Sequence, residues 1–205
     1  MKQRLPERIN AIAVQGLGLI TALIGVKMMV TTESVLIVLV SVVIGGALGE
    51  ILQIEARLDR FGTKVEARFN RSGGIFAKAF VTSSLLYCVG PMAILGALQD
   101  GLRGDYAILL TKSGLDGVAS VAFASTLGIG VLFSVLPVAA YQGGITLGAS
   151  ALAPYLSGSV LSEMTATGGV IILGLALNIL QAAKIRAGNL LPAIAIAAVL
   201  SGLSL

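Results

Sequence analysis

Residues 99–142 read QDGLRGDYAILLTKSGLDGVASVAFASTLGIGVLFSVLPVAAYQ, and this stretch places Lys112 and Asp116 inside apolar sequence. The two residues are four positions apart, so on a helix they share one face and neutralise each other. An ionisable group at membrane depth costs about 2.5 to 3.5 kcal/mol on insertion scales, and such groups usually face a bundle interior or an aqueous cavity. The pair is therefore the first candidate for a functional site.

The composition around this stretch is that of a membrane protein. Of the 205 residues, 56% are hydrophobic and 12% are charged, and the mean hydropathy is +0.97. Soluble domains carry roughly one-quarter charged residues, and a helix needs about 20 apolar residues to cross the hydrocarbon. We expect an all-α, polytopic transmembrane helical bundle that forms a single integral membrane domain over residues 1–205.

The spacing of glycine, proline and polar residues predicts about seven membrane segments, some of them kinked or broken. The Gly90-Pro91 pair is expected to interrupt the third segment, which starts at Ile75. Residues 106–156 hold enough apolar sequence for two passes, with a turn expected at Gln142, so that the first pass is over-long. Whether residues 144–156 span the membrane or re-enter is left open. The other expected spans are 11–30, 35–52, 167–180 and 190–203.

Residues 54–71 predict an amphipathic helix that lies along the cytoplasmic membrane surface. Its apolar residues recur at helical spacing, from Ile54 through Leu58 to Phe61, with charged residues between them. Five basic residues lie between Arg57 and Arg71, which makes this segment the strongest cytoplasmic marker in the chain. Seven passes also return Lys184 and Arg186 to the cytoplasmic side.

Glycines near the end of the second expected span indicate a close helix contact. Gly45, Gly46 and Gly49 follow one another within a run that ends at Glu50. Small residues let two membrane helices bring their backbones together. We therefore expect another helix to pack closely here.

Ser120 follows Asp116 at the same four-residue spacing and extends the polar stripe of the pair. Gln142 and Asn178 add uncharged polar groups in other expected spans. These five residues, Lys112, Asp116, Ser120, Gln142 and Asn178, are the candidate substrate or ion pathway. The spacing leaves a second interpretation open, in which the pair only fixes helix register and the amides are packing contacts.

Composition and motifs argue against several other classes of function. The chain has no histidine and a single cysteine, Cys88, which argues against a zinc or haem site. It has no dinucleotide loop, no phosphate-binding lysine motif and no nucleophile elbow, so we expect neither an enzyme nor a bound cofactor. The basic residues behind the net charge of +4 flank membrane segments, which indicates orientation rather than nucleic-acid binding.

Four motifs give the chain a family resemblance. They are LPERI at residues 5–9, GALGE at 46–50, GALQDGLRGDYAILLTKSGLDG at 96–117 and GIGVLFSVLPVAAYQGG at 128–144. Together they resemble the YqgA and YdfK-like bacterial inner-membrane proteins, a family without assigned function. The resemblance runs over essentially the whole chain and implies a helical bundle in the bacterial cytoplasmic membrane. Members of that family carry a further apolar helix before LPERI, whereas this sequence starts at Met1, directly beside it.

The preferred hypothesis is a transporter of a small solute or monovalent ion. Asp116 would be the ion- or proton-linked group, and Lys112 its counter-charge or an anion contact. The alternative is a membrane scaffold or regulatory partner that transports nothing, with the basic amphipathic helix as its docking surface. The expected partners are the lipid bilayer and the small solute or ion, and a homo-oligomer is left open.

Overall fold

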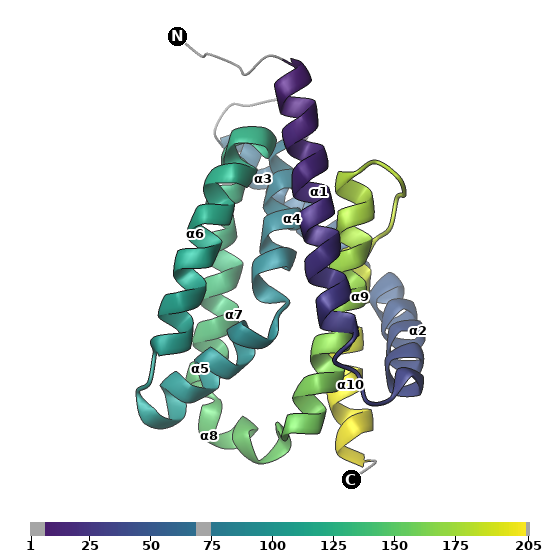
Figure 1. Cartoon of the computed structure of the whole chain (residues 1–205), viewed down its shortest axis with the longest axis vertical. Helices are drawn as coiled ribbons and strands as arrows, with labels where there is room; N and C mark the ends of the chain where they lie inside the picture. The colour runs from purple at the N-terminus through teal and green to yellow at the C-terminus, as the bar shows by residue number, and fades with distance from the viewer. Residues whose placement is uncertain (1–6, 69–74, 204–205) are drawn as a thin grey trace.

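The computed structural model describes residues 7–68 and 75–203, and this part of the chain is helical without a strand (Figure 1). The α-helices are α1 (Glu7–Met29), α2 (Val35–Leu52), α3 (Ile54–Arg68), α4 (Ile75–Cys88), α5 (Pro91–Arg103), α6 (Ala107–Leu127), α7 (Val135–Leu147), α8 (Ala149–Leu152), α9 (Gly158–Ile179) and α10 (Pro192–Leu203). Short 3₁₀ turns lie at η1 (Ile129–Ser134), η2 (Ala153–Tyr155) and η3 (Ala187–Leu190). The predicted all-α bundle is confirmed.

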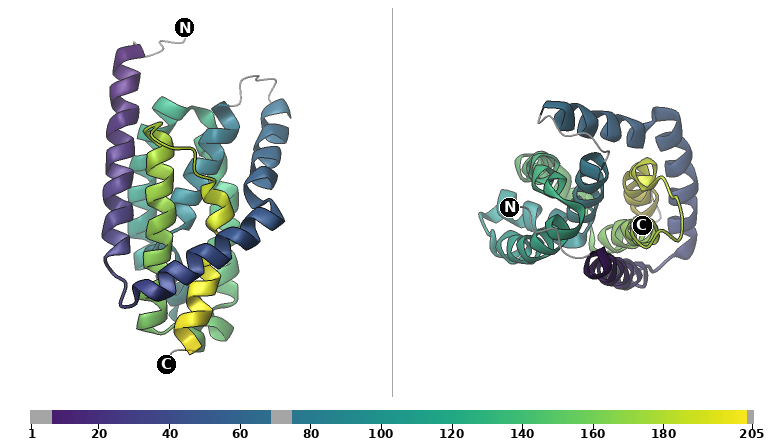
Figure 2. Two further views of the ribbon diagram at one scale, coloured as in Figure 1. Left: turned by 90° about the vertical axis from the view of Figure 1, so that its right-hand side faces the viewer. Right: turned by 90° about the horizontal axis from the view of Figure 1, so that it is seen from above.

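Successive long segments run in alternate directions along the bundle, and α2 crosses it obliquely (Figure 2). Within residues 7–68 and 75–203, five helices are long and apolar enough to cross a membrane, and the bent pair α4–α5 makes a sixth candidate. The apolar stretch Ala187–Leu203, which contains α10, is shorter than these. This stretch corresponds to the last predicted segment, residues 190–203, so at most six of the about seven predicted segments are of spanning length in the described part of the chain. The start of α1, the end of α3 and the loop after α9 all lie at the upper end of the view in Figure 1.

The predicted break in the third segment is confirmed. The axes of the two halves, Phe76–Cys88 and Met92–Arg103, differ by 59°. Gly90 is fully extended, with φ 174°, and the next residue is a proline at the start of α5. Proline has no N–H, so the carbonyl four residues before it, that of Tyr87, loses its usual helical hydrogen bond. The break therefore frees backbone polarity at membrane depth.

The turn predicted at Gln142 is wrong, because the chain turns at Gly128 instead. Gly128 has φ +93°, a backbone conformation that side chains other than glycine disfavour. The two passes are consequently α6, with 21 residues, and η1 with α7, which run through Ile129–Leu147. Gln142 and the two glycines after it stay inside α7. Residues 149–155 form the short α8 and η2, a connection at the lower end of Figure 1 rather than a further pass.

The amphipathic helix predicted from residue 54 forms as α3 and ends at Arg68, while residues 69–71 lie outside the described part of the chain. Its apolar face packs on α4: the rings of Phe61 and Phe80 are 5.7 Å apart, centroid to centroid. Leu58 also packs against the main core cluster. The apolar stripe is therefore covered by protein along part of its length.

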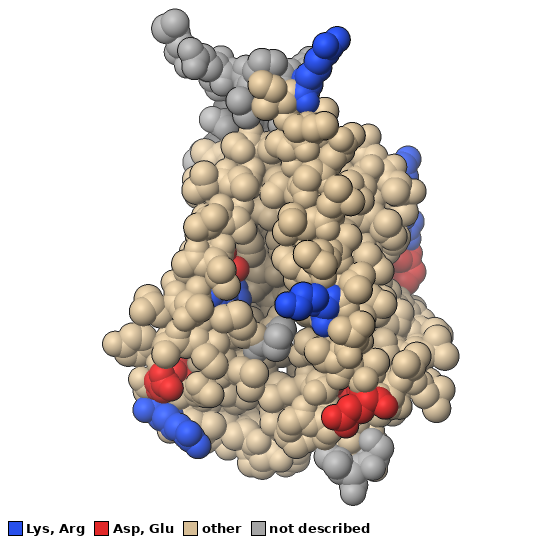
Figure 3. Space-filling view, viewed as in Figure 1, with Lys and Arg blue, Asp and Glu red and all other residues tan. Residues whose placement is uncertain are grey.

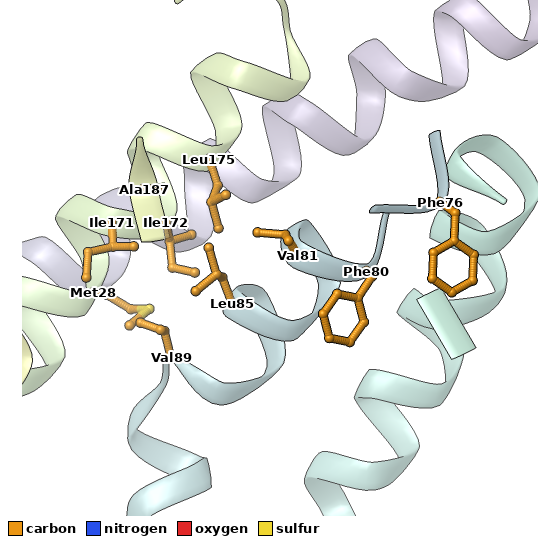
Figure 4. Packing of buried hydrophobic residues seen from close by; sticks show 10 residues of the cluster. All are labelled: Met28, Phe76, Phe80, Val81, Leu85, Val89, Ile171, Ile172, Leu175 and Ala187. Atoms are coloured by element: carbon orange, nitrogen blue, oxygen red, sulfur yellow. The ribbon is translucent and has the colours of Figure 1, made fainter. Parts of the chain in front are cut away.

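The main core lies where α4, α9 and α1 meet (Figure 4). Ile171 and Ile172 of α9 are fully buried against Leu85 of α4 and against Val89, which follows the end of α4, and Met28 closes the cluster from α1. α1 approaches α9 closely because Gly25 and Gly169 face each other. A Cβ atom on Gly25 would lie 2.9 Å from the Gly169 carbonyl oxygen. The backbones can pack this closely only because both positions lack side chains.

The predicted close approach of another helix to the end of α2 is also confirmed. A Cβ on Gly45 would overlap the backbone of Ala193 in α10, and one on Gly49 would overlap the Asn189 carbonyl of η3. The outward side of α2 carries exposed apolar residues, such as Leu39 and Val43. This is the distribution that a lipid-facing helix requires.

A buried carboxylate that the sequence did not single out fixes the turn between α1 and α2. Glu163 of α9 is 2% exposed and accepts hydrogen bonds from the amides of Glu33 and Ser34, at 2.7 and 3.0 Å, and from the Thr32 hydroxyl, at 2.7 Å. These amides precede α2, so the carboxylate also lies at the positive end of that helix. Glu163 therefore joins α9 to the start of α2.

Replacing Glu163 should lower stability in a graded way. Glu163→Ala leaves two amides without their acceptor and should lower the free energy of unfolding by about 1 to 3 kcal/mol. Glu163→Gln keeps one acceptor oxygen and should cost less. Thermal unfolding of the purified protein in detergent measures both, and equal stability of the alanine variant and the wild type would contradict the assigned role.

A matched pair of glycine substitutions tests the contact between α1 and α9. Gly25→Ala should lower the free energy of unfolding by about 1 to 3 kcal/mol, because the added methyl group overpacks the helix crossing. Gly16→Ala on the same helix is the control, since a Cβ there meets nothing within 4 Å. The control should be neutral or slightly stabilising, because alanine favours a helix over glycine. Similar unfolding midpoints for the two variants would contradict the close crossing.

Candidate functional site

The site starts from the ion pair between Lys112 and Asp116 on α6. The Lys112 side chain is 11% exposed and the Asp116 side chain is 30% exposed. At 1.5 Å per residue, Lys112 lies about 8 Å and Asp116 about 14 Å along α6 from its first residue. The pair is therefore well inside the apolar span. Figure 3 shows charged atoms of both signs at the edge of a hollow beside α6, on an otherwise mostly uncharged face.

Tyr87 connects this stripe to α4. The Ser120 hydroxyl donates to the Tyr87 hydroxyl at 2.9 Å, and Lys112 Nζ lies 5.9 Å from the centre of the Tyr87 ring. An ammonium within about 6 Å of an aromatic face is attracted by the ring. Tyr87 is 5% exposed and is the second-last residue of α4, directly before the break. The broken span and the charged stripe therefore meet at one side chain.

These groups line a cavity of about 290 Å³ between α4, α6, η1 and α7, called here the central cavity. Its polar lining comprises Tyr87, Lys112, Ser113, Asp116, Ser120, Ser134 and Gln142. Most of the hydroxyls already donate within the protein: Ser113 to the Leu110 carbonyl and Ser134 to the Val131 carbonyl. The cavity thus offers a charged pair and hydroxyl oxygens in an apolar surrounding.

Gln142 adds an unpaired hydrogen-bond donor to the central cavity. Its Nε2 atom is buried and has no partner within the described part of the chain. Buried polar groups are nearly always hydrogen-bonded to protein, water or ligand. Gln142 reaches this position because α7 continues through it instead of turning there. Its amide therefore keeps an unused hydrogen-bond donor beside the cavity.

Asn178 is the one predicted pathway residue that the structure does not bring to the central cavity. Its amide donates to the Ile185 carbonyl at 2.6 Å and accepts from the Ile185 amide at 2.7 Å. This pair of bonds closes the loop that follows α9. Lys112, Asp116, Ser120 and Gln142 converge without Asn178.

Asn178 lines a second and larger cavity of about 1130 Å³, called here the loop cavity. It is bounded by α3, by α4 from Ala77 to Leu85, by the end of α9 and by residues 181–187. At its edge, Asn189 donates to Glu50 at 2.6 Å and accepts from the Glu55 amide at 2.8 Å, and Glu50 pairs with Arg186. These contacts fix the junction of α2 and α3 to the loop after α9.

The Glu55 carboxyl, which belongs to this junction, has a shifted pKa. Partial burial raises its pKa above the ordinary value. The hydrogen bond from the Gly188 amide, at 2.9 Å, opposes that shift, and the nearby Asp59 adds to it. The raised pKa favours the protonated carboxyl in the folded protein, so any stabilisation from this shift is lost as pH rises through the folded pKa.

Sequence reasoning missed Tyr87 because its neighbours in the chain are apolar. Its partner Ser120 is 33 residues away, so no local spacing relates the two. Its position three residues before Gly90-Pro91 was the available signal, since broken membrane helices often line polar sites. Glu163 was missed for a similar reason, because its hydrogen-bond partners lie about 130 residues earlier.

The fold and the central cavity define the class of protein: a polytopic α-helical membrane protein with a polar site beside a broken span. The chain belongs to the family described as protein of unknown function DUF554, whose model matches residues 1–202. It is 32% identical to the uncharacterized membrane protein YdfK of Bacillus subtilis, over 95% of this chain and 84% of that protein. It is 29% identical to the uncharacterized protein YqgA of Escherichia coli, over 98% of this chain and 88% of that protein. No solved structure matches the chain.

Two serine substitutions on α6 test the contact across the central cavity. Ser120→Ala removes the hydrogen bond to buried Tyr87 and should lower the free energy of unfolding by about 0.6 to 2 kcal/mol. Ser125→Ala is the control, because Ser125 is exposed and bonds only to the Ala122 carbonyl of its own helix. Thermal unfolding should separate the two variants, and an unchanged Ser120→Ala midpoint would contradict the contact.

Proposed function

We propose that the protein moves a small solute or monovalent ion across the bacterial cytoplasmic membrane through the central cavity. The observation that carries the proposal is the convergence of Lys112, Asp116, Ser120 and Gln142 on that cavity. Ionisable groups at membrane depth are costly, and they commonly mark ion or substrate pathways. A packing role alone does not require a cavity beside them.

The break between α4 and α5 supports the same proposal. Secondary transporters commonly bind substrate and coupling ion where membrane helices are interrupted, because freed backbone groups and half-helix ends supply polar contacts. Tyr87 belongs to both the interrupted helix and the lining of the central cavity. At about 290 Å³, the cavity is at the lower end of ligand pockets and favours a small solute or an ion with some water.

The residues divide into three roles in this proposal. Asp116, the more exposed member of the pair, is the ion- or proton-linked group. Lys112 is its counter-charge, held in place by the Tyr87 ring, and becomes available to an anion when Asp116 binds a cation. Gln142 supplies the free amide donor. None of these roles needs a cofactor or a metal, and we infer that the protein is not an enzyme.

The proposed orientation puts the basic helix α3 and the loop after α9 on the cytoplasmic side. Arg57 and Arg60 of α3 and Lys184 and Arg186 of the loop follow the rule that basic residues concentrate in cytoplasmic segments. α3 and the loop share one end of the bundle, and Arg103 lies at the end of α5, toward the other end. Reporters attached at Arg103 should therefore give an external signal.

The alternative role as a scaffold or regulatory partner has less support in the geometry. Both members of the ion pair belong to α6, so their bond does not join two helices. The contacts that do cross to α4 are those that Tyr87 makes with Ser120 and Lys112. An ion pair whose main purpose was helix packing would be expected to lie between helices.

The proposal predicts a ligand that stabilises the wild type and loses its effect when Asp116 is changed. Purified protein is heated with sodium, potassium, ammonium, small anions and metabolites at several pH values. A ligand at a hundred times its dissociation constant should stabilise the native state by about 2.7 kcal/mol. Asp116→Asn should remain folded and show no response. Flux of the same compound into proteoliposomes should depend on Asp116.

The control is Glu33→Gln, which changes a carboxylate to an amide at an exposed position far from the central cavity. This variant should keep both the thermal response and the flux. If Asp116→Asn keeps the wild-type flux and stability, the proposed pathway is wrong. If no compound stabilises the wild type while Asp116→Asn is much less stable, the scaffold role is favoured.

A further inference from the structure

The loop cavity has two chemically distinct walls. Glu55, Asp59 and Thr63 line it from α3, where their spacing places them on one face. Lys78 lines it from α4, and Lys184 and Arg186 line it from the loop after α9. The cavity therefore presents carboxylates from one element and cations from two others.

Several of these charges have no ion-pair partner among the residues that the structure describes. Among the residues that the structure describes, the ion pairs are Lys112 with Asp116 and Glu50 with Arg186. Lys78, Lys184 and Asp59 are exposed and belong to neither pair, although all three line the same cavity. An occupant carrying both signs of charge would find a complement on each wall.

The lining becomes apolar with depth. Lys78 lies in the first turn of α4, and Val81 and Leu85 follow on the same face, one and two turns further into the bundle. Leu85 is about 10 Å below Lys78 along the helix axis. Leu175 of α9 completes this apolar floor, one turn below Asn178. The charged rim and apolar floor match a molecule with a charged head and a hydrocarbon tail.

We propose that the loop cavity binds a phospholipid whose head group is phosphoethanolamine. Lys78 and Lys184 contact the phosphate, Asp59 accepts hydrogen bonds from the primary ammonium, and the start of an acyl chain lies over Val81, Leu85 and Leu175. The cavity volume of about 1130 Å³ exceeds the roughly 300 to 1,000 Å³ of ordinary small-molecule pockets. Basic pockets between membrane helices on the cytoplasmic side are known sites for the phosphates of anionic lipid head groups, and the placement of the loop cavity on that side rests on the orientation proposed above.

The carboxylates decide between the common head groups. Phosphatidylglycerol carries no cation, so Asp59 would face it without compensation. Phosphatidylcholine carries a quaternary ammonium, which has no N–H to donate to a carboxylate. A primary ammonium both neutralises Asp59 and donates to it, and such charge-assisted hydrogen bonds are roughly twice as strong as neutral ones. The site is therefore selective for the amino head group, and it does not depend on the proposed transport function.

The test adds dioleoyl phosphatidylethanolamine, phosphatidylglycerol or phosphatidylcholine to the delipidated protein in detergent and measures bound lipid by native mass spectrometry. Phosphatidylethanolamine should bind most tightly. Lys78→Gln should weaken phosphatidylethanolamine and phosphatidylglycerol alike, by about fivefold. Asp59→Asn should weaken phosphatidylethanolamine alone and remove the preference over phosphatidylglycerol. Both positions are exposed, so the variants should fold normally.

Lys64→Gln is the matched control, because Lys64 is an exposed lysine of α3 outside the cavity lining. It should bind all three lipids as the wild type does. Equal binding of the three lipids by the wild type, or equal loss in Lys64→Gln and Lys78→Gln, would overturn the proposal. Soluble glycerophosphoethanolamine is included as a further probe. If it binds as tightly as the lipid, the apolar floor has no role and the lipid assignment is wrong.

Discussion

The need to satisfy backbone hydrogen bonds in a medium without water governs this structure. Long helices meet that need internally, and α1, α2, α6, α7 and α9 do so along their spans. The pair α4–α5 does not satisfy all its backbone hydrogen bonds internally, because Gly90 is extended and Pro91 has no N–H. Freed backbone polarity is tolerated at membrane depth only inside protein or beside a polar cavity. The charged stripe of α6 lies next to that break and supplies this environment.

α4 separates the central cavity from the loop cavity. Residues two positions apart on a helix point to nearly opposite sides, since each residue advances about 100°. Leu85 accordingly lines the loop cavity, while Tyr87 lines the central cavity. Both cavities therefore have α4 as a shared wall.

Local chemistry accounts for the features that could be predicted from the sequence. Apolar runs of spanning length specify helices in lipid, and the Gly90-Pro91 pair specifies a break because of what proline lacks. The pairing of Lys112 with Asp116 follows from their spacing on one helix, and the amphipathic helix α3 follows from its periodicity. The turn was predicted at Gln142 instead of Gly128 because glutamine and glycine at residues 142–144 are compatible with a packed helix. The backbone at Gly128, with φ +93°, shows the true turn.

The sequence by itself determined the helical class, the lipid environment, the broken span and the ion pair, because each depends on residues close together in the chain. The tertiary structure alone decided which distant groups meet. It brought Tyr87 and Gln142 to the charged stripe, bound the Asn178 amide to the loop after α9, and placed Glu163 against the α1–α2 turn. Such contacts between residues distant in the sequence depend on how the helices pack and on where each helix ends. Side-chain periodicity within a single helix carries no information about either.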